Sequence, residues 1–152
     1  NLGITWKQFD LSLLFQGQAK VINTIQETWV DPSSGGAGNL MQWWTEDMWT
    51  PENTDGTKPR LGTPNKINGT TFTNINAAFF KLKNAEIGYT LPVAVREKIG
   101  VANARVYLSG TNLFSFDHMR GMGIDPEATG SGYGGWALNP QRLINLGVNV
   151  SF

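Results

Sequence analysis

The feature that most constrains the fold is a strict alternation of apolar and polar residues. The last eight residues, NLGVNVSF, place Leu146, Val148, Val150 and Phe152 at every second position, with Asn, Gly and Ser between them. A period of two gives a β-strand one apolar face and one polar face. The same period runs through FDLSLLFQGQA, the second half of FFKLKNAEIGYTL and most of ARVYLSGTNLF. The alternation therefore predicts an all-β protein.

Five strands are expected, joined by connections that alternate between short and long. The expected strands cover residues 1–5, 9–19, 79–91, 104–114 and 141–152. The short connections are Trp6–Gln8 and Leu91–Asn103, and the long ones are Lys20–Ala77 and Asp117–Leu138. Consecutive strands joined by short turns pair in an antiparallel manner.

Three local features are expected within this frame. PVAVREKIG predicts a short helical turn between Pro92 and Gly100. NLMQWWTEDMW predicts a short helix with Asn39 as its N-cap, which Pro51 ends soon afterwards. Asn112 falls on the apolar face of its strand, and a β-bulge there would restore the alternation.

Composition excludes several classes of protein. The 12 basic and 12 acidic residues balance, so no nucleic-acid partner is expected. The chain has no cysteine, which excludes disulfides and thiolate metal sites. No apolar run approaches the ~20 residues of a membrane helix.

Short turns on one rim and long loops on the other are typical of outer-membrane β-barrels, whose strands need only ~9–11 residues to cross. Aromatic residues agree, because Phe9, Tyr89 and Phe152 fall at the short-turn rim and Phe114 at the long-loop rim. Five strands are too few to close a barrel, since about eight is the minimum. We therefore expect the chain to be a piece of a longer one, with further strands upstream.

Several segments resemble a known family. FFKLKNAEIGYTLP, RVYLSGTNLF, GIDPE and LGVNVSF, in this order, resemble the end of the SusC/RagA-type TonB-dependent transporters of Bacteroidota. EDMWTPENTDGTKPRL resembles that family's RWTPENP…PR loop, with Met48 where arginine is usual. The resemblance implies that residues 1–152 are the C-terminal part of a transmembrane barrel of about 22 antiparallel strands with long extracellular loops.

The resemblance also implies function and partners. Members of the family import glycans or peptides across the outer membrane, with a SusD-like surface lipoprotein as a lid and the TonB system as the source of energy. The plug and the TonB-contacting segment belong to an N-terminal part that this chain lacks. No enzymatic activity, metal or cofactor is implied.

The chain ends in a pattern that resembles the barrel-assembly signal. Asn145, Gly147, Val150 and Phe152 occupy its named positions and would be read by the barrel-assembly machinery. The alternative is an ordinary edge strand that happens to end on phenylalanine. The strands upstream favour the signal.

The two faces of the strands and the long loops are expected to do different work. Apolar side chains would meet outer-membrane lipid, and polar positions would face the lumen, among them Ser12, Gln16, Arg105 and Ser109. In the loops, five aromatic residues are candidates for contact with the glycan or oligopeptide substrate or with the lipoprotein: Trp43, Trp44, Trp49, Tyr133 and Trp136. Packing within the loops, or against a partner, is favoured over direct stacking on a ligand.

Other motifs have ordinary explanations. GSGYGG matches a dinucleotide-binding pattern but lacks the preceding strand and following helix, so a loop is favoured. The lone histidine, His118, has no evident metal partners. Asp125 and Glu127, in DPEATG, are assigned to a turn rather than to calcium or acid–base chemistry. Glu46 and Asp47 are expected to be solvated, and the sequons NGT and NVS match by pattern alone.

Two other classes are rivals to the transporter. A soluble β-sandwich carbohydrate-binding module would share the alternating strands and loop aromatics, but it needs a second sheet. A barrel hydrolase would need a nucleophile and a base, and no partner for His118 is evident.

Overall fold

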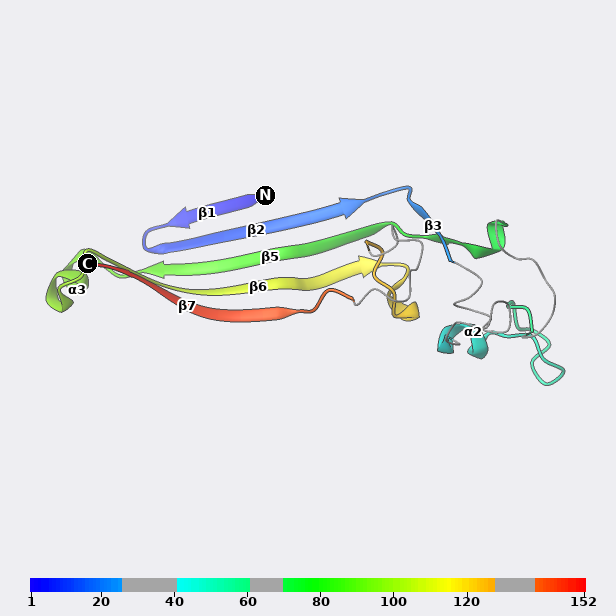
Figure 1. Cartoon of the computed structure of the whole chain (residues 1–152). Helices are drawn as coiled ribbons and strands as arrows, with labels where there is room; N and C mark the ends of the chain where they lie inside the picture. The colour runs from blue at the N-terminus through cyan, green and yellow to red at the C-terminus, as the bar shows by residue number, and fades with distance from the viewer. Residues whose placement is uncertain (26–40, 61–69, 128–138) are drawn as a thin grey trace. The chain divides into compact units, whose positions relative to one another are not determined.

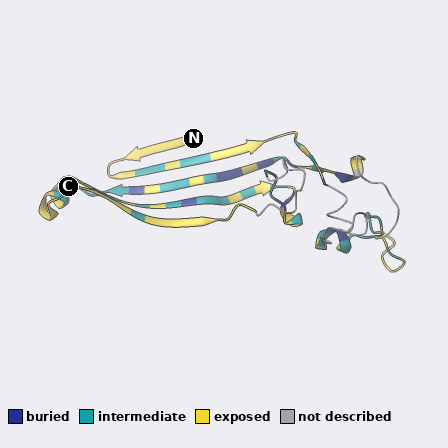
Figure 2. Cartoon of the chain, in the orientation of Figure 1, coloured by how far each residue is buried: buried dark blue, intermediate teal, exposed yellow. Residues whose placement is uncertain are grey.

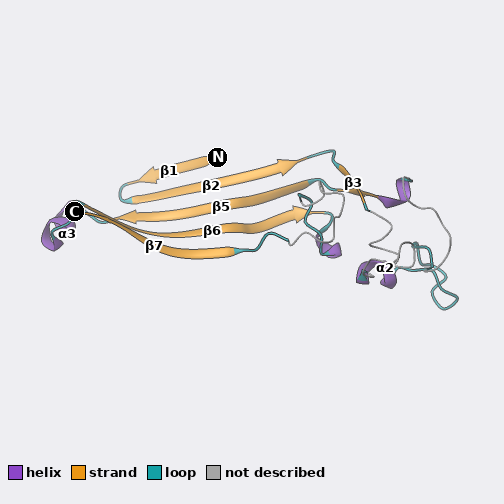
Figure 3. Ribbon diagram, viewed as in Figure 1, coloured by secondary structure: helices purple, strands orange, loops and turns teal. Residues whose placement is uncertain are grey.

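The computed structural model describes residues 1–25, 41–60, 70–127 and 139–152. The chain divides into two compact units. The first comprises Asn1–Gln18, Phe80–Phe116 and Pro140–Phe152, and the second comprises the described parts of Ala19–Phe79 and Asp117–Asn139. Most of the regular structure is β-strand, as the alternation predicts (Figure 3).

The first unit is a five-stranded sheet in the order β1-β2-β5-β6-β7, and neighbouring strands run in opposite directions (Figure 1). All five expected strands are present. They are β1 (Leu2–Trp6), β2 (Phe9–Gln18), β5 (Phe79–Thr90), β6 (Asn103–Asp117) and β7 (Leu143–Ser151).

The pairing of β6 with β7 confirms that the alternation separates two faces. Leu108 pairs with Leu146, and the next position along, Ser109, pairs with Asn145. Directly paired residues lie on the same face of a sheet, so apolar side chains gather on one face and polar ones on the other. Leu146 is 76% exposed, and β7 is exposed along almost its whole length (Figure 2). The first unit, which is described in full, contains no second sheet to cover this face.

Both short connections form as expected. Lys7 and Gln8 link β1 to β2, with Lys7 in a left-handed conformation at φ 54°. Helix α3 (Val93–Ile99) begins after Pro92 and ends at Gly100, whose φ is 72°. The Gly100 N–H donates to carbonyls of the last helical turn, which is the usual glycine C-cap. Within the described ranges, no helix has the length and apolar character needed to cross a membrane.

The irregularity predicted at Asn112 is also present. Asn112 has φ 52°, and the register between β6 and β7 ends one residue earlier, at Thr111. A Cβ built on Gly110 would lie 2.6 Å from Cδ2 of Leu113, so the two residues share a face. A spacing of three would put them on opposite faces of a regular strand. The alternation therefore breaks between them.

The second unit contains strands that sequence analysis missed. Within the long connection, β3 (Ile22–Thr24) pairs in an antiparallel manner with β4 (Asn74–Asn76). Three residues are too few to show a period, which is why the pattern appears lost there. The described residues of this unit also include two 3₁₀ turns, Thr71–Thr73 and Arg120–Met122.

The expected tryptophan-rich helix forms, but it is shorter than expected. Helix α2 covers Gln42–Glu46, with Met41 at the N-cap position and no side-chain cap. The expected N-cap, Asn39, lies outside the described residues, and the capping role assigned to it is corrected to Met41. The helix contributes Trp44 to the core of the second unit, whose other buried members are Ile25, Ala77, Met119 and Ile124.

The uncovered face generates a first prediction. The 152 residues, expressed alone in aqueous buffer, should aggregate and show no cooperative thermal transition. The reason is that the sheet exposes a large apolar face and two unpaired edges. Size-exclusion chromatography and circular dichroism test this, and a monodisperse monomer with a sharp melting curve would contradict it.

Candidate functional site

The polar face of the sheet carries a charged network centred on Arg105 in β6. Its Nε donates to Oδ1 of Asp10 at 3.0 Å, and its Nη2 donates to Oδ2 of the same carboxylate. Nη2 also donates to Oε1 of Glu86 at 2.7 Å. We call these three residues the Arg105 network. One guanidinium faces two carboxylates from β2 and β5, so the network ties three strands together and carries a net negative charge.

Gly88 provides the space for the guanidinium. A Cβ built on Gly88 would lie 2.5 Å from Cζ of Arg105 and closer still to Nε and Nη2. Real Cβ atoms essentially never make such contacts. Any other residue at position 88 would therefore displace the guanidinium from Asp10 and Glu86.

A second close contact lies beside the network, between β6 and β7. Tyr107 pairs directly with Gly147, and a Cβ built on Gly147 would lie 2.6 Å from Cε1 of the tyrosine ring and closer still to Cζ and Oη. The ring therefore lies over the glycine. Cζ of Arg105 is 5.2 Å from the centroid of the same ring, which is within the range of a cation–π contact.

Of the four residues predicted to face the lumen, Ser12, Arg105 and Ser109 lie on the face of the Arg105 network. Ser109 and Arg105 share a face of β6, since each pairs with a polar-face asparagine of β7. Ser12 follows Asp10 by two residues in β2, and so lies on the face of the network. Gln16 lies in β2 beyond the residues paired with β1.

The residues of the predicted assembly signal divide between the two faces. Asn145 and Gly147 lie on the polar face, while Val150 pairs with Ala104 on the other. Phe152 follows the end of β7 and is 95% exposed. Their recognition by the assembly machinery stays a prediction.

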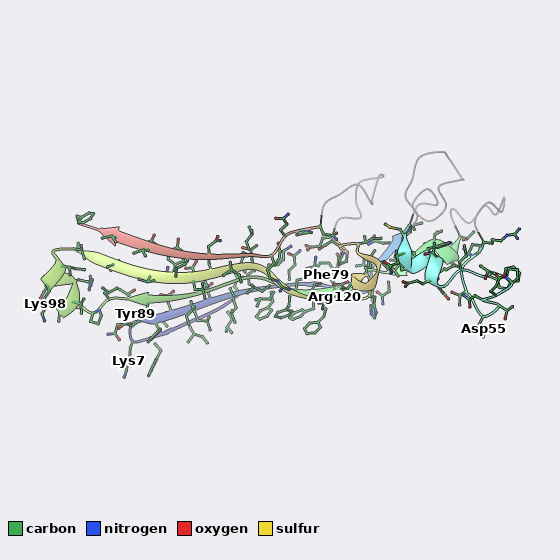
Figure 4. The ribbon with its side chains drawn as sticks, turned by 90° about the horizontal axis from the view of Figure 1, so that it is seen from below. Lys7, Asp55, Phe79, Tyr89, Lys98 and Arg120 are labelled. Carbon is green, nitrogen blue, oxygen red and sulfur yellow. The ribbon has the colours of Figure 1, made fainter. Side chains whose placement is uncertain are left out.

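Aromatic pairs lie at both ends of the sheet, and their place at a membrane interface stays a prediction. Phe9 and Tyr89 lie 4.7 Å apart between ring centroids, at the short-turn end of the sheet. Figure 4 shows Tyr89 and Lys7 at this end, with side chains projecting from both faces of the sheet. At the other end of the sheet, Phe114 contacts Phe116, with ring centroids 5.3 Å apart.

The loop aromatics differ in how far they are buried. Trp44 is 3% exposed and packs in the core of the second unit, with Trp43 partly buried against that core. Trp49 is 42% exposed. Tyr133 and Trp136 lie outside the described residues.

The side chain of Asp47 is 44% exposed, and it also has partners that the sequence did not reveal. Its carboxylate accepts hydrogen bonds from the backbone N–H and the hydroxyl of Thr57, and it lies 3.8 Å from Nζ of Lys58. These partners, led by the Thr57 hydroxyl, lower the pKa of Asp47 below its ordinary value. The spacing of ten residues hid this turn, because it matches no helical or hairpin pattern. Glu46 accepts a hydrogen bond from Gln42 on the surface of α2.

The remaining motifs show no reactive arrangement in the described part of the chain. Oδ1 of Asp125 accepts the N–H of Glu127 at 2.8 Å, as expected for an Asp-initiated turn. His118 is exposed, and the described residues contain no cluster of three potential metal ligands. GSGYGG lies outside the described residues.

Sequence reasoning assigned Gly147 only to the assembly signal and gave Gly88 no role. It placed Arg105 on the polar face but missed its partners. The alternation alone puts Asp10, Glu86 and Arg105 on polar faces, which is a usable hint. Contacts across strands, however, depend on a register that a single sequence does not show.

Comparison with known proteins decides the family. No protein-family model matches the chain. TonB-dependent receptor P26 of Formosa agariphila is 34% identical over 119 residues, covering 70% of this chain. TonB-dependent receptor P3 of the same organism is 29% identical over an alignment of 170 residues that covers all of it. The chain belongs to the TonB-dependent receptors.

Solved structures agree with this relationship. The RagAB peptide importer in its open-open state and the RagAB peptide transporter each match 99% of the chain, with a TM-score of 0.72 and identities of 26% and 27%. This TonB-dependent receptor chain spans 16% of P3, 12% of P26 and 16% of the RagAB chains. The resemblance to SusC/RagA-type transporters is thereby confirmed.

Asp47 generates a second prediction. In the full-length receptor, Asp47→Ala should increase hydrogen exchange at the amide of Thr57, because the carboxylate that accepts its hydrogen bond is lost. The Asp47 pKa is lowered from 3.8, so the difference from wild type should be present above that pH. It should vanish as the pH falls through the lower folded pKa, where the carboxylate becomes protonated.

Hydrogen-exchange mass spectrometry across this pH range measures the difference. Glu46→Ala is the matched control, because the carboxylate of Glu46 accepts its hydrogen bond from Gln42 in its own helix. An equal effect of both substitutions, or a difference that does not diminish as the pH falls below 3.8, would count against the assignment.

Proposed function

We propose that the chain forms wall strands and surface loops of an outer-membrane importer driven by the TonB system. The observation that supports this most strongly is the uncovered apolar face of a sheet whose fold matches the RagAB importers over 99% of the chain. Strands β2, β5, β6 and β7 have 10, 12, 15 and 9 residues. These lengths suit a membrane crossing, which needs ~9–11 residues per strand.

The proposed barrel is larger than this sheet. We assign residues 1–152 to the C-terminal part of a closed barrel of about 22 strands, with lipid against the apolar face and the lumen against the Arg105 network. The chemical task is passage of a nutrient without bond chemistry, so no catalytic residue is assigned.

The proposed substrate is an oligopeptide, since both RagAB structures are described as peptide importers or transporters. A glycan is the alternative within the same family. The proposed partner is a SusD-like surface lipoprotein. Among the loop aromatics that the structure describes, Trp49 is exposed, and we assign it to contact with the partner or the substrate. Trp43, Tyr133 and Trp136 remain candidates for the same role.

Growth of the native bacterium tests the substrate. Deleting the full-length receptor should abolish growth on oligopeptides as the sole amino-acid source, and a wild-type copy should restore it. Growth on free amino acids is the control. Loss of growth on a glycan alone would transfer the proposal to glycan import, and no defect on either nutrient would refute import.

The orientation of the two faces generates a further prediction. In the full-length receptor, Leu108→Arg should impair membrane folding, because Arg on a lipid-facing position costs ~2–4 kcal/mol at the bilayer midplane. Ser109→Arg, at the next position and on the polar face, is the matched control and should be milder. Folding into vesicles, followed on gels, compares the two, and equal effects would show that the face assignment is wrong.

The terminal phenylalanine generates another prediction. Phe152→Ser should lower the amount of receptor in the outer membrane, because the assembly machinery reads the terminal strand before it is paired. The molecules that arrive should keep normal heat resistance, since Phe152 is almost fully exposed. Quantitative blotting and heat-modifiability of the same fractions test this. Normal amounts with reduced heat resistance would make Phe152 a structural residue instead.

A further inference from the structure

We infer that β6 fixes the register of its two neighbours through two contacts with glycine, Arg105 over Gly88 and Tyr107 over Gly147. The inference goes beyond import and does not depend on the substrate. It gives Gly147 a structural role inside a pattern otherwise explained by assembly. It also makes Arg105 and Tyr107 positioning residues for strands β5 and β7.

The need for such contacts follows from the symmetry of a β-strand. A slip of one residue turns every side chain to the opposite face, which in the proposed barrel would put polar side chains against lipid and apolar ones in the lumen. A slip of two residues keeps both faces as they are. The alternation that defines this sheet therefore gives no protection against a two-residue slip.

The tyrosine–glycine contact opposes that slip between β6 and β7. Tyr107 pairs with Gly147, whose polar-face neighbours in β7 are Asn145 and Asn149. A slip of two residues in either direction would place an asparagine under the ring. The space that Gly147 leaves is already filled by ring atoms, so a side chain there cannot be accommodated without moving the ring.

The arginine–glycine contact acts in the same way between β5 and β6. The polar-face neighbours of Gly88 in β5 are Glu86 and Thr90, and both have a Cβ. A guanidinium is a flexible group and would normally move aside. Here Asp10 and Glu86 hold it in place through three hydrogen bonds.

The two contacts support each other. Arg105 and Tyr107 are two residues apart on the same face of β6, and the guanidinium lies 5.2 Å from the ring centroid. If the ring swung away from Gly147, it would lose its cation–π contact with Arg105. The register of β7 is thereby coupled to the ion pairs that reach back to β2.

A double-mutant cycle in the full-length receptor tests the inference. Gly147→Ala should lower the temperature at which the detergent-purified barrel loses its folded migration on gels. In a Tyr107→Ala background the same substitution should cause no further shift, because the ring that it displaces is absent. Gly3→Ala is the control, since Gly3 also lies on the polar face and a Cβ there would meet nothing within 4 Å.

The cycle separates this role from recognition by the assembly machinery. If Gly147 acted only through recognition, Gly147→Ala would lower the recovered amount equally in both backgrounds, and that result would overturn the inference. An unchanged transition temperature for Gly147→Ala alone would also overturn it. If Gly147→Ala yields no folded receptor, adding Tyr107→Ala should restore folding. Failure to restore folding would overturn the inference.

A cross-link reports on register directly. Ser109→Cys and Asn145→Cys, at positions that pair in the native register, should be joined by a short thiol-specific cross-linker, because directly paired Cβ atoms lie ~4.5–5.5 Å apart. Gly147→Ala should reduce the cross-linked fraction. Adding Tyr107→Ala to that variant should restore the fraction, because the ring that meets the new methyl group is absent. An unchanged fraction in Gly147→Ala would show that the contact does not set the register.

Discussion

The structure depends on a sheet whose apolar face has no partner within its own unit. Water is a poor partner for it, because exposed large apolar side chains recur along all five strands. A lipid environment removes this conflict, and it also explains why the strands are long and why backbone groups are paired along them. The outer-membrane barrel that we propose from the relationship to TonB-dependent receptors and the match to RagAB would supply this environment.

The opposite face of the sheet is polar. It is free of the need to be apolar, so it can carry charges and glycine. The Arg105 network uses this freedom to join β2, β5 and β6, while Tyr107 joins β6 to β7 through Gly147. The polar face thus supplies the specificity of pairing that a uniform apolar face cannot.

The sequence predicted those features that repeat or that have local chemistry. Alternation revealed the five strands, Pro92 and Gly100 bounded α3, and the misplaced Asn112 marked a break. Features that depend on distant contacts were not predictable from one sequence. Strands β3 and β4 are too short for periodicity, and the acceptor role of Asp47 involves a residue ten positions away.

The glycines show the same limit most clearly. In the sequence, Gly3, Gly88 and Gly147 are all glycines at polar-face positions of a strand. A Cβ at Gly3 would meet nothing within 4 Å, whereas a Cβ at Gly88 or Gly147 would meet a side chain of β6. Only the register distinguishes them. Sequence alone therefore indicates which face a residue occupies but not what lies across from it.

The most direct test of this account is the environment of each face of β7. Single cysteines at Leu146, Val148, Asn145 and Asn149 can carry a fluorophore in the full-length receptor, reconstituted in vesicles. This chain adds no competing cysteine, and any cysteine elsewhere in the receptor is first replaced by serine. Brominated lipid should quench the label at Leu146 and Val148 and leave it bright at Asn145 and Asn149. Equal quenching at all four positions, or the reverse pattern, would contradict the assignment of one face to lipid and the other to the lumen.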